Sequence, residues 1–164
     1  MSQAKVIREF SHSDHQHATC IDEAINTAEA TCRQRGGRLT AIRRRVLELV
    51  WASHEPVKAY DVLDILRNER SSAAPPTVYR ALDFLQEEGL VHKIESLNAY
   101  VGCGKPGHME GGQFLICSDC GEVAELADSD LVTLIRNQAE QLGFAIEEQV
   151  VEIKGRCAQC LPAN

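Results

Sequence analysis

Long apolar runs are missing from this 164-residue sequence, although hydrophobic residues make up 44% of it. A membrane-spanning helix needs about 20 consecutive apolar residues, and no stretch approaches that length. The opening residues, MSQAKVIREFSHSDHQH, contain no apolar segment followed by a small-residue cleavage site. We therefore expect no secretory signal and a cytoplasmic location. The hydrophobic content allows a packed core, and the length allows one ordinary domain or two small ones.

Catalytic signatures are missing as well. The sequence contains no phosphate-binding loop, no His-Glu-x-x-His motif and no recognisable pair of nucleophile and base. We therefore expect that the protein is not an enzyme.

Basic residues are in the minority: 17 Lys and Arg stand against 24 Asp and Glu, which gives a net charge of −7. The acidic excess is concentrated in residues 96–164, whose net charge is −6, whereas residues 20–95 carry only −1. Six arginines lie close together within the second segment: Arg33, Arg35, Arg38, Arg43, Arg44 and Arg45. A basic patch on a nearly neutral domain, joined to an acidic domain, is compatible with DNA binding.

Seven cysteines are present, and four of them form two Cys-x-x-Cys pairs, CSDC at 117–120 and CAQC at 157–160. In a reducing compartment, such cysteines indicate metal binding or redox chemistry rather than a disulfide framework. The complete ligand set for a structural zinc is Cys117, Cys120, Cys157 and Cys160. A thiol redox switch is the alternative. Because four thiolates fill the coordination of zinc, catalysis at this metal is not expected.

Apolar residues recur with helical spacing in the first half of the chain. They predict a helix that ends before Gly36, a second capped by Thr40, a third over residues 59–66 and a fourth from Thr77 to Glu88. Two short strands follow, LVHKIE at 90–95 and AYVGC at 99–103. Helices followed by a β-hairpin are typical of a winged helix-turn-helix, here with an extra leading helix, over residues 18–103.

The remaining segments complete a prediction of an α+β protein with two domains. Residues 1–17 are polar, carry His12, His15 and His17, and are interpreted as a flexible tail, with weak auxiliary metal capture as the alternative. The glycine-rich segment 104–112 is interpreted as the hinge between the domains.

Residues 113–164 predict a small α/β domain. Its expected elements are the strands FLIC and EVAEL, a helix over 128–142 with a mostly apolar stripe, and a strand from 144 to about 156. A unit of this size is marginal alone, so we expect metal binding and dimerisation to stabilise it.

Three features together resemble the ferric uptake regulator superfamily of bacterial metalloregulators. These are PPTVYRALDFL at 75–85, the GLVHKIES and AYVGC hairpin, and the paired cysteine motifs. Within the superfamily, the sequence is most similar to the zinc uptake regulators, and the resemblance spans about residues 20–160. It implies a homodimeric, zinc-dependent repressor of zinc acquisition genes, with a winged-helix DNA-binding domain and an α/β dimerisation domain.

The resemblance also implies a second, regulatory zinc site at His92, Cys103, His108 and Glu125, which gives two zinc ions per chain. One cysteine, two histidines and a glutamate are a suitable tetrahedral set for zinc. Glu122 is a rival for the position of Glu125. Where many relatives carry a histidine-rich run before the first cysteine pair, this sequence reads GHMEGG, which argues against a sensor of iron, manganese or peroxide.

On DNA, the predicted contacts come from the fourth helix and the start of the third. Tyr79 and Arg80 lie where base edges are read, Thr77 lies at or near the cap and suits a phosphate, and Tyr60 suits the backbone or a thymine methyl. For Tyr60 and Tyr79, packing between helices is the alternative. The expected partner is a double-stranded operator with palindromic half-sites. The alternative functions are a sensor of another metal or peroxide on the same fold, and a zinc-binding module without a DNA role.

Overall fold

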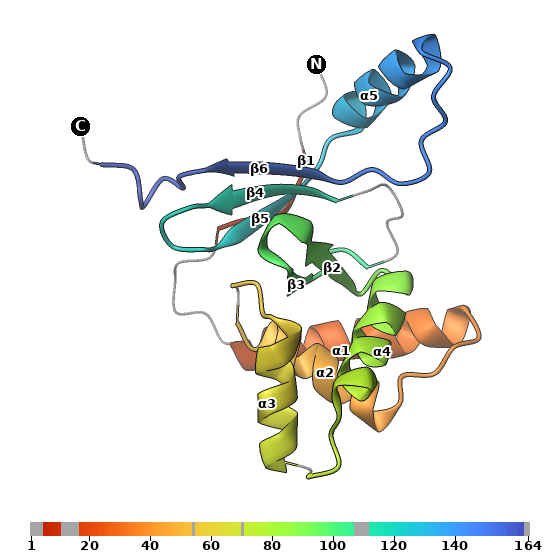
Figure 1. Ribbon diagram of the computed structural model, residues 1–164, viewed down its shortest axis with the longest axis vertical. Helices are drawn as coiled ribbons and strands as arrows, with labels where there is room; N and C mark the ends of the chain where they lie inside the picture. The colour runs from red at the N-terminus through yellow and green to blue at the C-terminus, as the bar shows by residue number, and fades with distance from the viewer. Residues whose placement is uncertain (1–4, 11–16, 54, 70, 107–111, 163–164) are drawn as a thin grey trace. The chain divides into compact units, whose positions relative to one another are not determined.

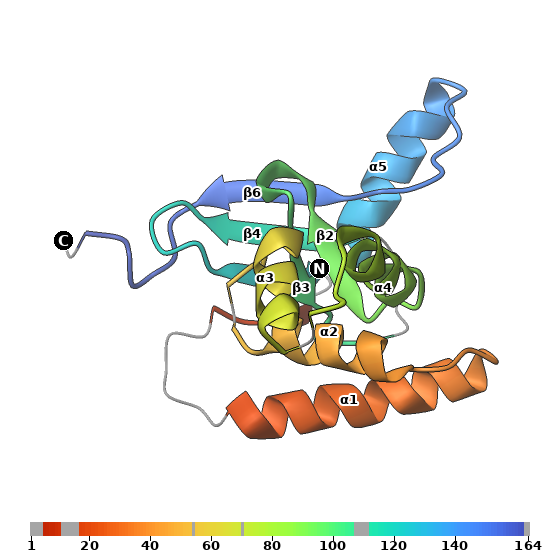
Figure 2. The same cartoon turned by 60° about the horizontal axis from the view of Figure 1, so that its bottom comes forward.

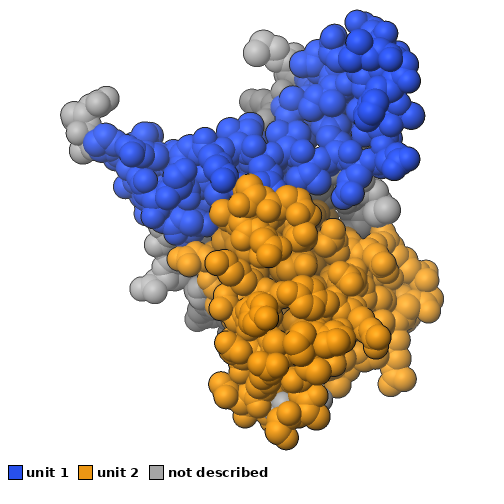
Figure 3. All heavy atoms as spheres, viewed as in Figure 1, with its two compact units in different colours: residues 1–11, 109–164 blue, residues 12–108 orange. Residues whose placement is uncertain are grey.

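The chain folds into two compact units, which Figure 3 distinguishes by colour. The computed structural model describes residues 5–10, 17–53, 55–69, 71–106 and 112–162. Residues 12–108 form the first unit, called the helical unit here, and residues 1–11 and 109–164 form the second, called the sheet unit. The hinge expected over 104–112 stays a prediction, because residues 107–111 lie outside the described part of the chain.

Four helices and a two-stranded antiparallel hairpin build the helical unit, as Figures 1 and 2 show. They are α1 (His17–Gln34), α2 (Ala41–Trp51), α3 (Ala59–Glu69), α4 (Pro75–Glu87), β2 (Val91–Ile94) and β3 (Ala99–Gly102), with a 3-10 turn, η1 (Glu95–Leu97), between the two strands. The apolar faces predicted for the helices are confirmed, because they form one buried cluster with residues of the hairpin. Within the described residues, no helix is long and apolar enough to cross a membrane.

The fourth helix begins two residues before its predicted start. Ala74 is the N-cap residue, and Pro75 takes the first helical position, where its missing N–H leaves no hydrogen bond unmade. The N–H of Thr77 donates to the Ala74 carbonyl at 2.9 Å. Thr77 is therefore not the cap itself but lies in the first turn, which agrees with the expectation that it lies at or near the cap. Thr40 does occupy the N-cap of α2, but its side chain makes no capping hydrogen bond with any described residue.

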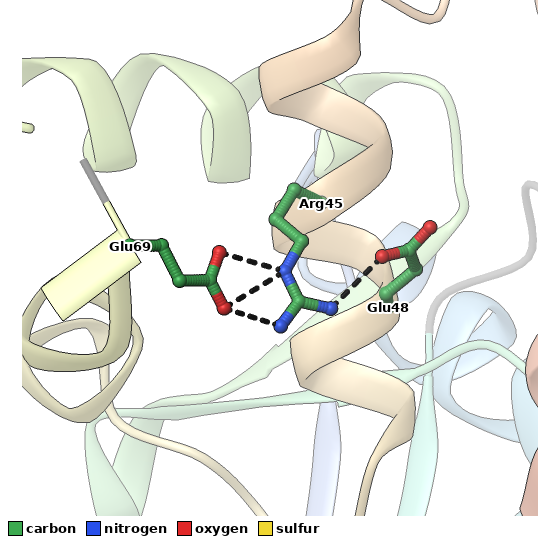
Figure 4. Close-up of polar contacts among 3 residues, drawn as sticks. All are labelled: Arg45, Glu48 and Glu69. Atoms are coloured by element: carbon green, nitrogen blue, oxygen red, sulfur yellow. Dashed lines mark hydrogen bonds and ion pairs between the residues drawn. The ribbon is translucent and has the colours of Figure 1, made fainter. Parts of the chain in front are cut away.

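Several arginines of the expected basic patch bind acidic side chains of the helical unit. Figure 4 shows Arg45 of α2 donating from Nε to Glu69 Oε2 at 3.0 Å and from Nη1 to Glu48 Oε2 at 2.9 Å. The hydrogen bond to Glu69 is the main cause that raises the pKa of Arg45. This network ties α2 to the last residue of α3. Its side chains are partly exposed, so water screens each pair to about 0–1 kcal/mol.

Three further arginines of the patch also contact side chains of the helical unit. Arg44 pairs with Glu29 at 2.9 Å, and Arg35 pairs with Glu88 at 3.5 Å. The guanidinium of Arg43 stacks on the ring of Phe84, 3.4 Å from its centroid. Much of the arginine cluster therefore holds the helices together. Fewer of its positive charges are available to bind DNA than the number of arginines in the sequence suggests.

A four-stranded sheet and one helix build the sheet unit. The elements are β1 (Lys5–Arg8), β4 (Gln113–Cys117), β5 (Val123–Ala127), α5 (Ser129–Gln141) and β6 (Val151–Gly155). The strand order is β1-β5-β4-β6. β5 pairs antiparallel with β1 and with β4, whereas β4 and β6 run parallel. The helix supplies the long connection that a parallel pair requires.

Two predictions about this unit are wrong. Residues 5–8, assigned to a flexible tail, form the edge strand β1 on β5; His12 and His15 lie outside the described residues, and His17 begins α1. The last strand was expected from residue 144 but begins at Val151. The register accounts for the second error, because Val151, where the strand begins, pairs with Gln113, the first residue of β4.

Helix α5 begins at a strong cap and leaves much of its apolar stripe exposed. Asp128 is the N-cap residue, and its Oδ1 accepts hydrogen bonds from the N–H groups of Asp130 and Leu131. The side chain of Gln113 bonds both the carbonyl and the N–H of Asp128, which fixes the start of the helix to β4. Among the residues that the structure describes, none in α5 is buried.

Candidate metal centres and DNA-contacting residues

The four predicted zinc ligands come together at one edge of the sheet. Cys117 ends β4, Cys120 lies in the turn that leads to β5, and Cys157 and Cys160 follow β6. Because β4 and β6 are parallel and in register to their last residues, both strands deliver their cysteines to the same end. All four sulfur atoms lie within 4.8 Å of one another.

Backbone hydrogen bonds shape each cysteine pair into a tight turn. The carbonyl of Cys117 accepts from the N–H of Gly121 at 3.0 Å, and Gly121 has a φ of +78°, which favours glycine. In the second pair, the carbonyl of Cys157 accepts from the N–H groups of Cys160 and Leu161, both at 3.0 Å. The turns therefore present the two sulfurs of each pair on one side.

The spacing and protonation of the thiols fit a divalent cation. A Zn–S bond of about 2.3 Å implies about 3.8 Å between sulfurs of a tetrahedron, and the sulfurs of Cys120 and Cys157 lie 3.9 Å apart. Backbone N–H groups of Cys120 and Cys157 lower the pKa of Cys117 to about 6. Hydrogen bonding with Cys157 raises the pKa of Cys160 to about 12. One thiolate is thus favoured without metal, and a central cation would offset the repulsion among four.

Two of the predicted regulatory ligands meet in the helical unit. His92 lies on β2 opposite Val101 of β3. Cys103 follows β3, is buried, and donates its N–H to the Leu90 carbonyl at 3.0 Å. The candidate ligand atoms of His92 and Cys103 lie within 4.8 Å of each other. The hairpin register therefore places a histidine and a cysteine close together as candidate metal ligands.

Of the other two regulatory candidates, one lies in the sheet unit and one lies outside the described residues. Glu125 lies on β5 of the sheet unit and is only 2% exposed. Its rival Glu122 precedes β5, and its carbonyl accepts the N–H of Cys117 at 2.9 Å, which makes it part of the first cysteine turn. His108 lies outside the described residues. The complete regulatory set of four ligands stays a prediction.

Trp51, which the sequence analysis did not single out, lies against Gly102, the residue before Cys103. A Cβ atom added to Gly102 would lie 2.2 Å from Cε2 and 2.4 Å from Nε1 of Trp51. The indole at the end of α2 therefore packs directly against the backbone of β3, one residue before Cys103. A glycine within a strand often marks such a close approach, so Gly102 was the available signal.

We expect Gly102→Ala to destabilise the helical unit by about 1–3 kcal/mol, because the new methyl group would displace the indole of Trp51. Urea unfolding followed by the fluorescence of Trp51, the chain's single tryptophan, measures this effect. Gly155→Ala on β6 is the matched control, since its Cβ would meet no described atom within 4 Å. Equal stability of the two variants would contradict the packing described here.

The predicted DNA-contacting residues lie on α3 and α4. Tyr60 at the start of α3 is 66% exposed, and Tyr79 on α4 is 43% exposed. The alternative that these tyrosines pack between helices is therefore not favoured. Arg80 is exposed beside Tyr79, and Thr77 is half-buried in the same turn. A DNA-binding role of these four residues stays a prediction.

Comparison with known proteins gives the family. The model of the ferric uptake regulator family matches residues 34–154, and the chain belongs to this family. It is 42% identical over 146 residues to the zinc uptake regulation protein of Escherichia coli K12, covering 87% of this chain and 84% of that protein. It is 32% identical over 127 residues to the ferric uptake regulation protein of Cupriavidus metallidurans, covering 76% of this chain and 87% of that protein.

Solved structures give the same assignment. A zinc uptake regulator complexed with zinc and DNA is similar at a TM-score of 0.79 and 43% identity, covering 85% of this chain and 94% of that chain. The crystal structure of holo XcZur is similar at a TM-score of 0.79 and 45% identity, covering 85% of this chain and 97% of that chain. The fold is thus a mixed α/β fold of the ferric uptake regulator type, with a four-cysteine cluster in its C-terminal region.

Proposed function

We propose that the protein is a zinc-responsive DNA-binding repressor of zinc uptake genes. The observation that carries this proposal is the similarity, over most of the chain, to a zinc uptake regulator solved with zinc and DNA. The chemistry of the candidate ligands supports it independently, because the clustered thiols and the His92–Cys103 pair supply the soft and borderline donors that zinc prefers.

In this proposal the helical unit is the winged helix-turn-helix domain. Its α4 enters the major groove, where Arg80 donates to guanine O6 and N7. Tyr79 contacts a neighbouring base edge, Thr77 contacts a phosphate, and Tyr60 contacts the backbone or a thymine methyl. The exposure of Tyr60, Tyr79 and Arg80 supports this assignment.

The four cysteines hold a structural zinc. Four thiolates leave no open coordination position, so this site stabilises the fold rather than reacting with a substrate. Their placement after β4 and β6 means that the metal fastens the last residues of the sheet unit to its first turn.

The regulatory zinc is held by His92, Cys103, His108 and Glu125. The hairpin supplies the first two ligands, the hinge supplies His108, and β5 supplies Glu125. A ligand set drawn from both units and the hinge is complete only in one arrangement of the units. Metal binding therefore selects the arrangement that binds DNA.

The energies allow such a switch. Moving a two-state equilibrium from about 1% to about 99% competent requires about 5.5 kcal/mol of differential affinity. Apparent binding energies of about 10–16 kcal/mol are typical of structural zinc in zinc-finger peptides. A regulatory site needs to couple only part of such an energy to the arrangement of the units.

The protein acts as a homodimer, through α5 and the residues that follow it. The exposed apolar side chains support this, since Leu134, Leu142, Phe144 and Ile153 are each more than half exposed in the single chain. An apolar surface of this kind is expected to be covered by another protein. In a symmetric dimer, two α4 helices face two half-sites of a palindromic operator, about one helical turn or a multiple apart.

Operator binding measured across buffered concentrations of free zinc, iron(II) and manganese(II) tests this function. We expect zinc alone to induce tight binding at low free concentration. Induction by iron or manganese instead would favour a sensor of another metal. Tight zinc binding without any effect on DNA would favour a zinc-binding module.

We also expect two zinc ions per chain with unequal affinities. The cysteine cluster and the regulatory set share no residue, and only the cluster offers four thiolates. Metal analysis of the fully loaded protein should therefore find about two zinc ions, and mild chelation should leave about one. A single zinc ion in the fully loaded protein would refute the regulatory site.

A further inference from the structure

The N-terminal strand β1 pairs with β5, the strand that carries Glu125. The family model matches residues 34–154 of this chain, so β1 lies outside the matched region. Both strands belong to the sheet unit. Their register therefore shows directly which residue of β1 accompanies Glu125.

That register contains a bulge. Val6 lies opposite Leu126, and Arg8 lies opposite Glu125. Two residues of β1 thus span a single step of β5, and Ile7 is the extra residue. In a regular antiparallel ladder Ile7 would face Glu125. A bulge can re-aim a side chain in this way, and here it replaces an isoleucine by an arginine beside the glutamate.

The surroundings of Glu125 explain why a neighbouring arginine matters for the charge of its carboxylate. On β4, the residue opposite Glu125 is Phe114, and both side chains are 2% exposed. A carboxylate buried beside an aromatic ring is costly unless cationic or hydrogen-bonding groups offset its charge. Directly opposed residues have Cβ atoms about 4.5–5.5 Å apart, within reach of a guanidinium. Arg8 is half-buried, and its Nε is shielded from solvent.

We propose that Arg8 is a positioning residue for the Glu125 carboxylate of the regulatory zinc site. With zinc bound, its guanidinium would pair with one carboxylate oxygen and leave the other as the metal ligand. Groups that hydrogen-bond to a metal ligand fix its orientation and raise its affinity for the metal, and the planar fork of arginine suits a carboxylate. The inference rests on the proposed function, because it requires Glu125 to be a zinc ligand.

Arg8→Gln in the full-length protein, with the cysteine site loaded, tests this role. We expect the regulatory site to bind zinc about 10–100-fold more weakly in chelator competition. The structural zinc and the dimer should be unchanged. With cobalt(II) in the regulatory site, the ligand-field spectrum should change in Arg8→Gln and partly recover in Arg8→Lys. Arg67→Gln, which removes an exposed arginine of α3 in the helical unit, is the matched control and should resemble the parent.

A second variant tests the bulge. Exchanging the two residues, as Ile7→Arg with Arg8→Ile, keeps the composition and charge of β1 but returns an isoleucine to the position opposite Glu125. We expect it to behave like Arg8→Gln. Parent-like zinc affinity in either the exchange variant or Arg8→Gln would overturn the inference.

Glu125→Gln separates this inference from the function on which it rests. If Glu125→Gln weakens regulatory zinc binding while Arg8→Gln does not, Glu125 is a ligand and only the role of Arg8 is refuted. If Glu125→Gln binds zinc like the parent, Glu125 is not a ligand, and the inference fails together with that part of the regulatory site.

Discussion

Cys157→Ser is expected to unfold the sheet unit and to abolish the dimer. Cys157 contacts both members of the first cysteine pair: its sulfur lies 3.9 Å from that of Cys120, and its N–H donates to the sulfur of Cys117 at 3.4 Å. Its loss leaves three thiolates and breaks the connection between the end of the chain and β4. Structural zinc contributes about 10–16 kcal/mol in zinc-finger peptides, whereas a whole domain is stable by only about 5–15 kcal/mol.

The measurements are zinc content, thermal unfolding and sedimentation. The variant should lose the tightly held zinc and sediment as a partly unfolded monomer. Cys20→Ser is the matched control, because Cys20 lies on α1 of the helical unit and belongs to neither candidate zinc site. A Cys157→Ser protein that stays a folded, DNA-binding dimer would refute the structural role of the cysteine cluster.

Local patterns were sufficient to predict the helical unit. The inner faces of its helices follow from a 3.6-residue period, and the structure buries the predicted positions in one core. The hairpin was equally visible, because its strands are neighbours in sequence. The start of α4 was placed two residues too late, at Thr77, whereas Pro75 already occupies the first helical position.

Long-range pairing was less visible in the sequence. The strand Lys5–Arg8 pairs with residues near 125, and nothing within a short polar segment identifies so distant a partner. The beginning of β6 depends on where β4 begins, so its own apolar residues could not define it. The arginine cluster suggested DNA binding because sequence gives the charge of Arg45 but not its partner Glu69.

The two candidate metal sites differ in the same respect: one follows from local sequence patterns and the other does not. The cysteine cluster could be assembled from two Cys-x-x-Cys pairs, since together they supply the four thiolates of a structural zinc site. The regulatory ligands have no common motif, and their prediction depended on the family resemblance. The structure brings the candidate ligand atoms of His92 and Cys103 within 4.8 Å of each other, and their role as zinc ligands stays a prediction. Packing partners such as Trp51 and Arg8 became visible only through the fold.

Cys103→Ser is expected to separate zinc sensing from folding. The residue lies at the end of the hairpin in the helical unit and outside the cysteine cluster. Its loss should therefore leave one tightly held zinc and a folded dimer. The regulatory site would lose its only thiolate, the softest donor of the set. We expect zinc-dependent operator binding to weaken strongly, because much of the energy that selects the DNA-binding arrangement depends on that site.

Arg80→Ala provides the contrast, because Arg80 is exposed on α4 and belongs to neither zinc site. This variant should keep both zinc ions and the dimer but lose sequence preference, at a cost of about 1–3 kcal/mol in operator binding. Operator titrations at buffered zinc, with metal counts for both variants, distinguish the two effects. If Cys103→Ser responds to zinc like the parent, the sensor lies elsewhere, and the assignment of His92, His108 and Glu125 as its ligands fails with it.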